Sequence, residues 1–184
     1  MRVEPAELGG VALVHPVVHY DERGSFRETW SLQRYRDAGL PEFVQDNLVY
    51  SRRGVLRGLH YQYPREQAKL VSVVLGEIYD VAVDIRTGSP TFGRWAAFEL
   101  SEDRGAVLYV PTGFAHGYAV VSETAVVTYK CSEYYDPASE GSVLWSDPGL
   151  GVAWPSPEPQ LSAKDRQAPL LTDIPTERLP RYLA

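Results

Sequence analysis

The middle of the chain alternates between short apolar segments and clusters of turn residues. Seven segments are rich in the β-branched and aromatic side chains that favour strands: Val55–Tyr61, Lys69–Leu75, Ile78–Ile85, Trp95–Leu100, Ala106–Val110, Ala115–Val121 and Thr124–Lys130. Turn residues such as Gly88-Ser89-Pro90 and Pro111-Thr112-Gly113 separate them. Short strands at even spacing predict a closed barrel or a sandwich, because closure removes exposed strand edges.

The two ends of the chain carry different patterns. A helix is expected at Leu32–Ala38, because Gly39 follows and is typical of a helix end. The segment after Trp154 is rich in proline, so it is expected to wrap the barrel as a loop, with one helical turn that begins at Ser162. Residues 1–184 are expected to form a single domain, with the N-terminal strands and the tail packed on the barrel.

Composition disfavours several classes of partner and location. Its hydrophobic content of 44% is that of a globular protein. The net charge of −6 disfavours DNA or RNA as a partner, although a small anionic ligand needs only a few local cations. Met1–Gly10 does not resemble a signal peptide, and no apolar stretch is long enough to span a bilayer, so no membrane partner is expected. Cys131 is the only cysteine, and a cytoplasmic location is expected.

Two of the four histidines stand in segments of recognisable form. Gly54–Glu66, which contains His60, resembles the first motif of the cupin superfamily, except that Gln62 stands where a second histidine is usual. Gly105–Val120, which contains His116, resembles the second cupin motif, except that valine replaces its closing asparagine. Two such half-matches in the right order predict an all-β fold: a cupin-like jelly-roll β-barrel with a few short helices.

Charged residues interrupt the apolar segments near His60. Arg57 and Lys69 lie in segments that otherwise look like core strands, and buried cations are costly unless they are paired. Their charges could reach solvent along the aliphatic stems, but their clustering favours an anionic pocket inside the barrel. Arg57 and His60 have opposite parity in a regular strand, so both can face this pocket only if Gly58 marks a bulge. Tyr129 shares the parity of its apolar neighbours and is expected to point inward.

With these motifs, the chain resembles the dTDP-4-dehydrorhamnose 3,5-epimerase family over nearly its whole length. The segments that carry the resemblance follow one another in order: Asp21–Glu28, Val44–Asn47, Gly54–Gln62, Lys69–Val71, Asp80–Arg86, Ser89–Gly93, Pro111–Gly117, Tyr129–Cys131, Trp145–Pro148 and Leu161–Asp165. Each segment alone is a weak signal, whereas all of them in order are a strong one. The chain departs from the usual family pattern at Ser25, where an aromatic residue is common, and at Ser72, where arginine is common.

The resemblance implies a role for particular residues. His60 would be the base, with Asp165 as its carboxylate partner. Tyr129 would donate a proton on the opposite face of the sugar, and Lys69 would lie near its keto oxygen. The residues implied to hold the nucleotide diphosphate and the sugar are Arg23, Phe26, Glu28, Gln45, Asn47, Arg57, His116, Glu140 and Lys164, with Tyr135 stacked on the thymine. The resemblance also implies a homodimer that shares its N-terminal strands, and neither a metal nor an organic cofactor.

These residue types suit the reaction. Epimerisation beside a ketone removes a C–H proton and returns it to the other face through an enolate. It needs a base, a group that stabilises the enolate oxygen and an acid opposite the base. Histidine, with an unperturbed pKa of about 6.5, suits the base near neutral pH. Lysine supplies positive charge where the enolate forms, and tyrosine can donate a proton. The expected reaction inverts C3 and C5 of dTDP-4-keto-6-deoxy-D-glucose to give dTDP-4-dehydro-L-rhamnose.

Several alternatives stay open. A metal-dependent cupin would place His60, Gln62, Glu66 and His116 around an ion, although such sites generally use more than two imidazoles. The chain could also be a nucleotide-sugar binding protein without activity, but such a protein would have no need of His60, Lys69 and Tyr129 together. A sugar 3,4-ketoisomerase shares the barrel but is expected to have a second histidine close to His60. Finally, some epimerases invert only C3 or only C5, which depends on how the sugar ring turns in the pocket.

Overall fold

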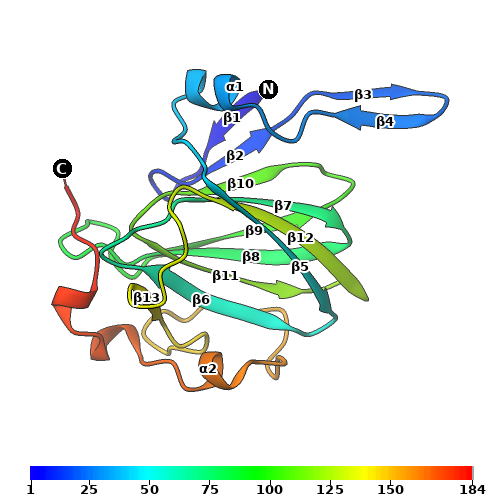
Figure 1. Ribbon diagram of the computed structural model, residues 1–184. Helices are drawn as coiled ribbons and strands as arrows, with labels where there is room; N and C mark the ends of the chain where they lie inside the picture. Colours follow the sequence, from blue (N-terminus) through cyan, green and yellow to red (C-terminus); the bar gives the residue numbers. More distant parts are fainter. Residues whose placement is uncertain (184) are drawn as a thin grey trace.

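Two β-sheets face each other in the computed structural model, which describes residues 1–183 (Figure 1). The six-stranded sheet has the order β1 (Arg2–Pro5), β2 (Ala12–His15), β10 (Val107–Val110), β7 (Lys69–Leu75), β12 (Thr124–Cys131) and β5 (Gln45–Arg52). The five-stranded sheet has the order β13 (Glu140–Ser142), β6 (Leu56–Gln62), β11 (Phe114–Val120), β8 (Glu77–Asp84) and β9 (Trp95–Ser101). Neighbouring strands are antiparallel throughout both sheets.

The helices are few and short. There are two α-helices, α1 (Leu32–Asp37) and α2 (Ala163–Arg166). Two 3₁₀ turns follow α2 in the chain, at Leu171–Asp173 and Thr176–Arg178. The all-β expectation with a few short helices is therefore confirmed, and each of the seven predicted strands is present with its ends within one residue of those expected. No helix in the described part of the chain is long and apolar enough to cross a membrane.

Four of the strands missed by the sequence pattern, β1, β3, β4 and β5, have polar or exposed faces. β5 alternates strictly: Gln45, Asn47, Val49 and Ser51 turn inward, while its other side chains are exposed. An inward face with two amides, a hydroxyl and only one apolar side chain does not predict a core strand, because the usual signal is an apolar inward face. β1, β3 (Val18–Asp21) and β4 (Gly24–Arg27) are four-residue strands with mostly exposed side chains.

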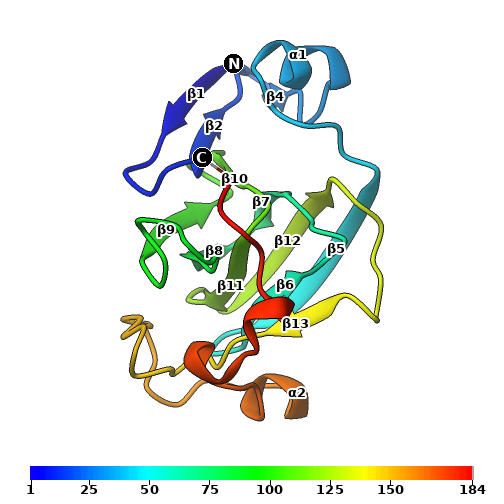
Figure 2. The same ribbon diagram turned by 90° about the vertical axis from the view of Figure 1, so that its left-hand side faces the viewer.

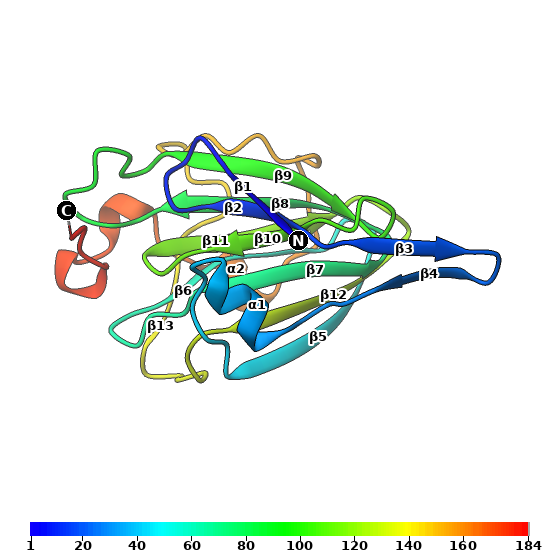
Figure 3. The same ribbon diagram turned by 90° about the horizontal axis from the view of Figure 1, so that it is seen from above.

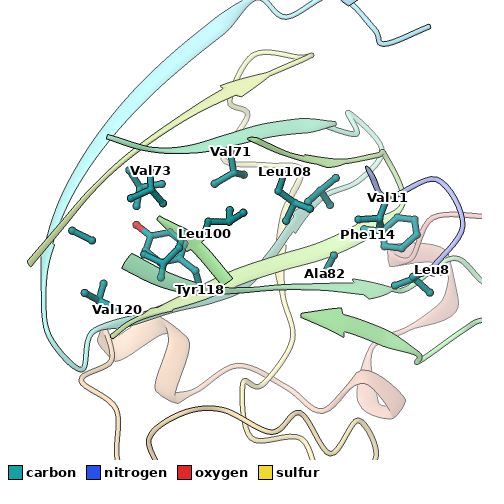
Figure 4. Close-up of a cluster of buried hydrophobic side chains, with 14 residues drawn as sticks. Leu8, Val11, Val71, Val73, Ala82, Leu100, Leu108, Phe114, Tyr118 and Val120 are labelled. Atoms are coloured by element: carbon teal, nitrogen blue, oxygen red, sulfur yellow. The ribbon is translucent and has the colours of Figure 1, made fainter. Parts of the chain in front are cut away.

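The main core lies between the two sheets. Figure 4 shows side chains from both: Val71 and Val73 of β7 lie across from Ala82 of β8 and Tyr118 of β11. Each fully buried valine or leucine side chain in this core contributes about 1.5–3 kcal/mol to stability relative to its exposed state. The polar cavity described below opens within this same interior, so the core fixes the strands that carry the polar side chains.

A second core covers the outer face of the five-stranded sheet. β8 and β11 are buried on both faces, and the outward Val81 and Val83 pack with Leu171 and Leu179 of the C-terminal segment. Figure 2 shows that segment, orange to red, running beneath β6 and β13. α2 begins as expected at Ser162, whose hydroxyl accepts a hydrogen bond from the Asp165 amide at 3.0 Å. Packing of the tail therefore brings α2 against β6.

The hairpin of β3 and β4 projects away from both sheets (Figures 1 and 3). Two of its aromatic side chains stand in the open, Tyr20 with 77% of its surface exposed and Phe26 with 70%. An isolated two-stranded hairpin is at best marginally stable in water. The hairpin thus presents apolar surface that its own chain does not cover.

Candidate active site

A cavity of about 230 Å³ opens between the two sheets next to α2. Its walls come from both sheets and from α2, and they gather most of the charged residues singled out in the sequence: Val49, Arg57, His60, Lys69, His116, Gly117, Tyr118, Tyr129, Glu140, Ser162, Lys164 and Asp165. The four residues expected to carry the chemistry, His60, Lys69, Tyr129 and Asp165, all line it. The inward orientation expected for Tyr129 is confirmed.

His60 and Asp165 are hydrogen-bonded, with 2.6 Å between the imidazole Nε2 and the carboxylate Oδ1. Burial raises the pKa of the Asp165 carboxyl, but its hydrogen bonds to His60 and Ser162 outweigh burial, so the pKa lies below its ordinary value. An ionised carboxylate in this position fixes the tautomer of the imidazole and stabilises its protonated form. The His60 side chain is about one-third exposed (32%), so its other ring nitrogen is available to a molecule in the cavity.

An irregularity in β6 lets both Arg57 and His60 line the cavity. His60 pairs with His116 and Arg57 pairs with Tyr118, and the register shifts between the two pairs. Gly58 lies at the shift with φ of +130°, and a Cβ atom there would stand 2.5 Å from the Cα atom of Gly117. Only glycine fits such a close approach of two backbones. The bulge predicted at Gly58 is thus confirmed.

Lys69 is a cation set in an apolar strand. Burial lowers the pKa of its ammonium group, an effect partly opposed by Cys131, Asp80 and Glu140. Its Nζ atom donates to the backbone carbonyl of His60 at 3.5 Å, which holds it beside that residue. Within residues 1–183 no carboxylate is in ion-pair contact with Lys69. The ammonium group is therefore free to bind an anionic oxygen in the cavity.

Tyr129 stands on the opposite wall from His60, because β12 and β6 belong to the two facing sheets. Burial raises the pKa of its phenol, with Cys131 acting in the same direction and Arg57 against it. The phenol is therefore protonated at neutral pH and can act as a donor. A base and an acid on opposite walls of one cavity match the geometry that epimerisation requires.

A smaller pocket of about 100 Å³ continues the cavity toward β5 and β13. Gln45, Asn47, Tyr135 and Glu140 line it and are bonded to one another: Gln45 Nε2 donates to Asn47 Oδ1 at 3.2 Å, and the Tyr135 hydroxyl donates to Glu140 Oε2 at 2.9 Å. Glu140 also forms an ion pair with Lys164 of α2. The residues expected to hold the nucleotide thus lie next to those expected to act on the sugar.

Three of the expected binding residues lie away from this cavity. Arg23 and Phe26 are on the projecting hairpin, where Arg23 Nη2 contacts Asp21 Oδ2 at 2.6 Å. Glu28 lies beside α1 and contacts Arg34 at 3.3 Å. One chain by itself does not bring them to the site.

Asp80 is a polar residue of the site that the sequence analysis did not identify. It is fully buried, and its two oxygens lie 2.8 and 3.0 Å from the Nε2 atom of His116. The sequence does contain a sign of its role, because Asp80 is a charged residue in an otherwise apolar strand, as Lys69 is. The second carboxylate of the same strand, Asp84, instead binds Arg86 with 2.7 Å between Oδ2 and Nη2.

The donors of the alternative metal site make other contacts. His60 is bonded to Asp165 and His116 to Asp80, while the Gln62 amide donates to the backbone carbonyl of Arg65 at 2.8 Å. In the part of the chain that the structure describes, no group of three or more His, Cys, Asp and Glu side chains is arranged to hold a metal ion.

Comparisons with known proteins agree with this geometry. Residues 5–173 match the family model described as dTDP-4-dehydrorhamnose 3,5-epimerase. The enzyme of that name from Salmonella typhimurium is 48% identical, and the alignment covers 93% of this chain and 96% of the relative. The Pseudomonas aeruginosa enzyme of the same name is 45% identical, with 94% and 97% covered.

Solved structures extend the likeness to the fold. The 3,5-epimerase of Legionella pneumophila, in complex with dTDP-4-keto-L-rhamnose, has a TM-score of 0.96 and 47% identity, with 100% of this chain and 99% of the other covered. A 3′-monoepimerase from Streptomyces bikiniensis, in complex with dTDP-quinovose, has a TM-score of 0.90 and 39% identity, with 97% and 93% covered. From its sequence and its cupin-like β fold, the chain belongs to the dTDP-4-dehydrorhamnose 3,5-epimerase family.

Proposed function

We propose that the chain inverts C3 and C5 of dTDP-4-keto-6-deoxy-D-glucose to give dTDP-4-dehydro-L-rhamnose. The observation that carries the proposal is one cavity in which the His60–Asp165 pair faces Tyr129, with Lys69 beside His60. Relatives that are 45–48% identical over nearly their full length carry the 3,5-epimerase name, which supports the same activity here.

Each step of the reaction has a suitable group. His60 takes the proton from the carbon next to the ketone, and the electron pair of the broken C–H bond forms the enolate. Asp165 stabilises the resulting imidazolium, and Lys69 stabilises the enolate oxygen. Tyr129 then donates its proton to the opposite face of the carbon. Exchange with solvent returns the imidazolium and the phenolate to their starting forms.

The nucleotide part of the substrate fits the remaining polar residues. Arg57 and Lys164 supply cations at the cavity for the diphosphate, and His116 lines the same cavity. Gln45, Asn47 and Glu140 would bind the nucleoside, with Tyr135 stacked on the thymine. Bound dTDP-sugars in the related crystal structures support a ligand of this class. The proposed chemistry needs neither a metal nor an organic cofactor, because the base, the acid and the cation for the enolate oxygen are all side chains of the cavity.

Deuterium incorporation tests the proposed reaction directly. Incubation of dTDP-4-keto-6-deoxyglucose with the protein in deuterated water is expected to place deuterium at both C3 and C5, because every inversion passes through an enolate that is reprotonated from exchangeable groups. NMR would identify the labelled carbons, with a sample lacking protein as the control for spontaneous exchange. No label above this control at either carbon would refute the epimerase proposal.

The same experiment decides between two-centre and one-centre inversion. A single-centre alternative is supported by the 39% identity to a dTDP-4-dehydrorhamnose 3-epimerase of Streptomyces niveus. Label at one carbon only would assign the chain to that type, whereas label and inversion at both would support the 3,5-epimerase.

We further propose that two chains form a dimer in which each hairpin completes the partner's site. The hairpin of β3 and β4, which carries Arg23 and Phe26, projects away from both sheets, and 70% of the Phe26 surface is exposed. β5 ends its sheet, has no second neighbouring strand within residues 1–183 and exposes Leu48 (68%) and Tyr50 (56%), so its outer edge is open and partly apolar. A second copy that lays its hairpin along this edge would cover both apolar surfaces and bring its Arg23 and Phe26 toward the nucleotide pocket.

Mixing two defective chains tests the shared site. A chain with His60→Ala and a chain with Arg23→Ala and Phe26→Ala are each expected to be nearly inactive. Mixed dimers, purified through two different tags, are expected to recover about half of the wild-type activity, because one of two symmetric sites has both His60 and an intact hairpin. Absence of recovery in a dimer that forms, or a monomer in sedimentation, would contradict the proposal.

We also propose that residues 1–184 act as one domain in the cytoplasm. The tail supports this because it contributes Asp165 and Lys164 to the cavity and packs Leu171 on the five-stranded sheet. The free, buried thiol of Cys131 suits a reducing compartment.

A further inference from the structure

Ser51 is a buried polar residue close to the cavity to which the proposed mechanism gives no role. It lies near the end of β5 on the inward face of the strand, and only 4% of its surface is exposed. It is not one of the residues that line the cavity. Its Oγ atom instead accepts a hydrogen bond from the Nε atom of Arg57, at 3.1 Å. Ser51 therefore stands behind a side chain that does line the cavity.

The bond between Ser51 and Arg57 joins the two sheets. β5 runs into β6 through a short turn at residues 53–55, so the two residues are six positions apart in the chain but belong to opposite sheets (Figure 1). Arg57 is exposed, and its side chain lines the cavity. Its positive charge opposes the rise in the pKa of the Tyr129 phenol, which requires the guanidinium group to lie near that wall of the cavity.

Ser51 is the one residue that fixes the Arg57 guanidinium group. Within residues 1–183 this side chain makes no other hydrogen bond and no ion pair. A guanidinium group has five N–H donors in a planar fork, and Ser51 takes up the one on Nε. The four donors on the two terminal nitrogens remain for a ligand. With Nε held, the fork can meet an anion in a bidentate contact end-on, through both terminal nitrogens.

A hydroxyl suits this position better than a carboxylate. Arginine has several rotatable bonds, and freezing them when a ligand binds costs free energy. An acceptor that holds Nε before the ligand arrives removes part of this cost. A carboxylate would hold Nε as well, but its negative charge would offset the positive charge that a diphosphate needs. The neutral serine hydroxyl orients the guanidinium group and leaves its charge available.

We propose that Ser51 is a positioning residue, whose hydroxyl holds the Arg57 guanidinium group with both terminal nitrogens directed at the diphosphate of the bound sugar nucleotide. The inference rests on the proposed function, because it takes a dTDP-sugar as the ligand. Ser51 itself does not touch this ligand. Loss of its hydroxyl therefore weakens binding only through Arg57, and it affects the affinity for the diphosphate more than the turnover of the sugar.

The substitution Ser51→Ala removes the acceptor and little else. It is expected to weaken dTDP binding about fivefold in titration calorimetry, the size of one hydrogen bond. KM for the keto-sugar nucleotide should rise by a similar factor while kcat changes less than about twofold, because the diphosphate is held equally in the ground state and the transition state. Ser101→Ala is the matched control and should change neither, since Ser101 lies on β9 and accepts from the Arg104 amide at 3.2 Å, away from the cavity.

A double-mutant cycle tests whether the effect passes through Arg57. Arg57→Ala should bind dTDP more weakly than Ser51→Ala does, and adding Ser51→Ala to it is expected to change the affinity less than about twofold. The rival role of Ser51 is to serve the buried phenol of Tyr118, whose pKa burial raises to about 12 while the nearby Ser51 hydroxyl opposes the rise. In that role Ser51→Ala would cause the same loss with or without Arg57, which would overturn the inference.

Two simpler results would also overturn the inference. One is unchanged dTDP affinity in Ser51→Ala, and the other is a fall in kcat with KM unchanged. Wild-type protein that places no deuterium at C3 or C5 would instead be a failure of the proposed reaction, and dTDP binding by the wild type and the variants would still decide the role of Ser51. A loss of dTDP affinity that disappears in the Arg57→Ala background would support it.

Discussion

Replacing His60 by alanine is expected to lower the rate of solvent exchange at both C3 and C5 by about 10²–10⁴-fold, the usual contribution of a positioned general base. The His60 imidazole is bonded to a buried carboxylate and is about one-third exposed, whereas His116, which is bonded to Asp80, is only 6% exposed. Lys69 cannot replace it, because its ammonium group lies beside the His60 carbonyl and would be needed at the enolate oxygen. Deuterium incorporation followed by NMR measures the loss at each carbon separately.

Two controls separate loss of the base from loss of the fold. Binding of dTDP to His60→Ala is expected to stay close to wild type, because the side chains expected to hold the nucleoside are Gln45, Asn47 and Tyr135, and His60 only borders their pocket. His15→Ala is a matched substitution outside the cavity, since His15 lies on β2 with its Nε2 atom 3.2 Å from Glu4, and it is expected to leave exchange unchanged. Full exchange in His60→Ala at either carbon would mean that another group is the base there.

The sheets could be predicted because their strands obey a local rule. Segments such as Lys69–Leu75 are apolar on the face that enters the core, and that alternation is legible without knowing the partner strand. β5 escaped prediction because three of its four inward side chains, Gln45, Asn47 and Ser51, are polar, so the apolar signal of a core strand is missing. The projecting hairpin escaped it because neither face of the hairpin is buried in one chain.

The contacts of the site could be predicted only in part. His60 and Asp165 are separated by 105 positions, and their hydrogen bond depends on a tail that packs on the outer face of β8 and β11. No local pattern encodes that path, so the pairing rested on resemblance to a family. The irregularity at Gly58 was within reach of sequence reasoning, because one glycine stood between two polar residues of opposite parity. The His116–Asp80 contact was equally legible as a carboxylate in an apolar strand, and was missed.

Replacing Tyr129 by phenylalanine is expected to separate exchange from inversion. His60 can still remove a proton and return a deuteron to the same face, so the starting sugar should gain deuterium without a change of configuration. Net inversion needs a donor on the opposite wall, and its rate is expected to fall by about 10²–10⁴-fold. NMR of the recovered sugar in deuterated water gives both numbers from one sample, the label in unchanged sugar and the amount of epimer formed.

The ratio of exchange to inversion is the informative quantity. Burial keeps the Tyr129 phenol protonated, so in the wild type each enolate meets a ready donor and inversion keeps pace with exchange. In Tyr129→Phe the ratio should rise by at least about tenfold. Tyr109→Phe should leave it unchanged, because Tyr109 is a partly buried tyrosine of β10 that packs in a cluster away from the cavity. If exchange and inversion fell together, Tyr129 would be needed to form the enolate and would not be the donor. If inversion persisted, the proton would come from another group or from water, and the two-wall geometry of His60 and Tyr129 would no longer account for the stereochemistry.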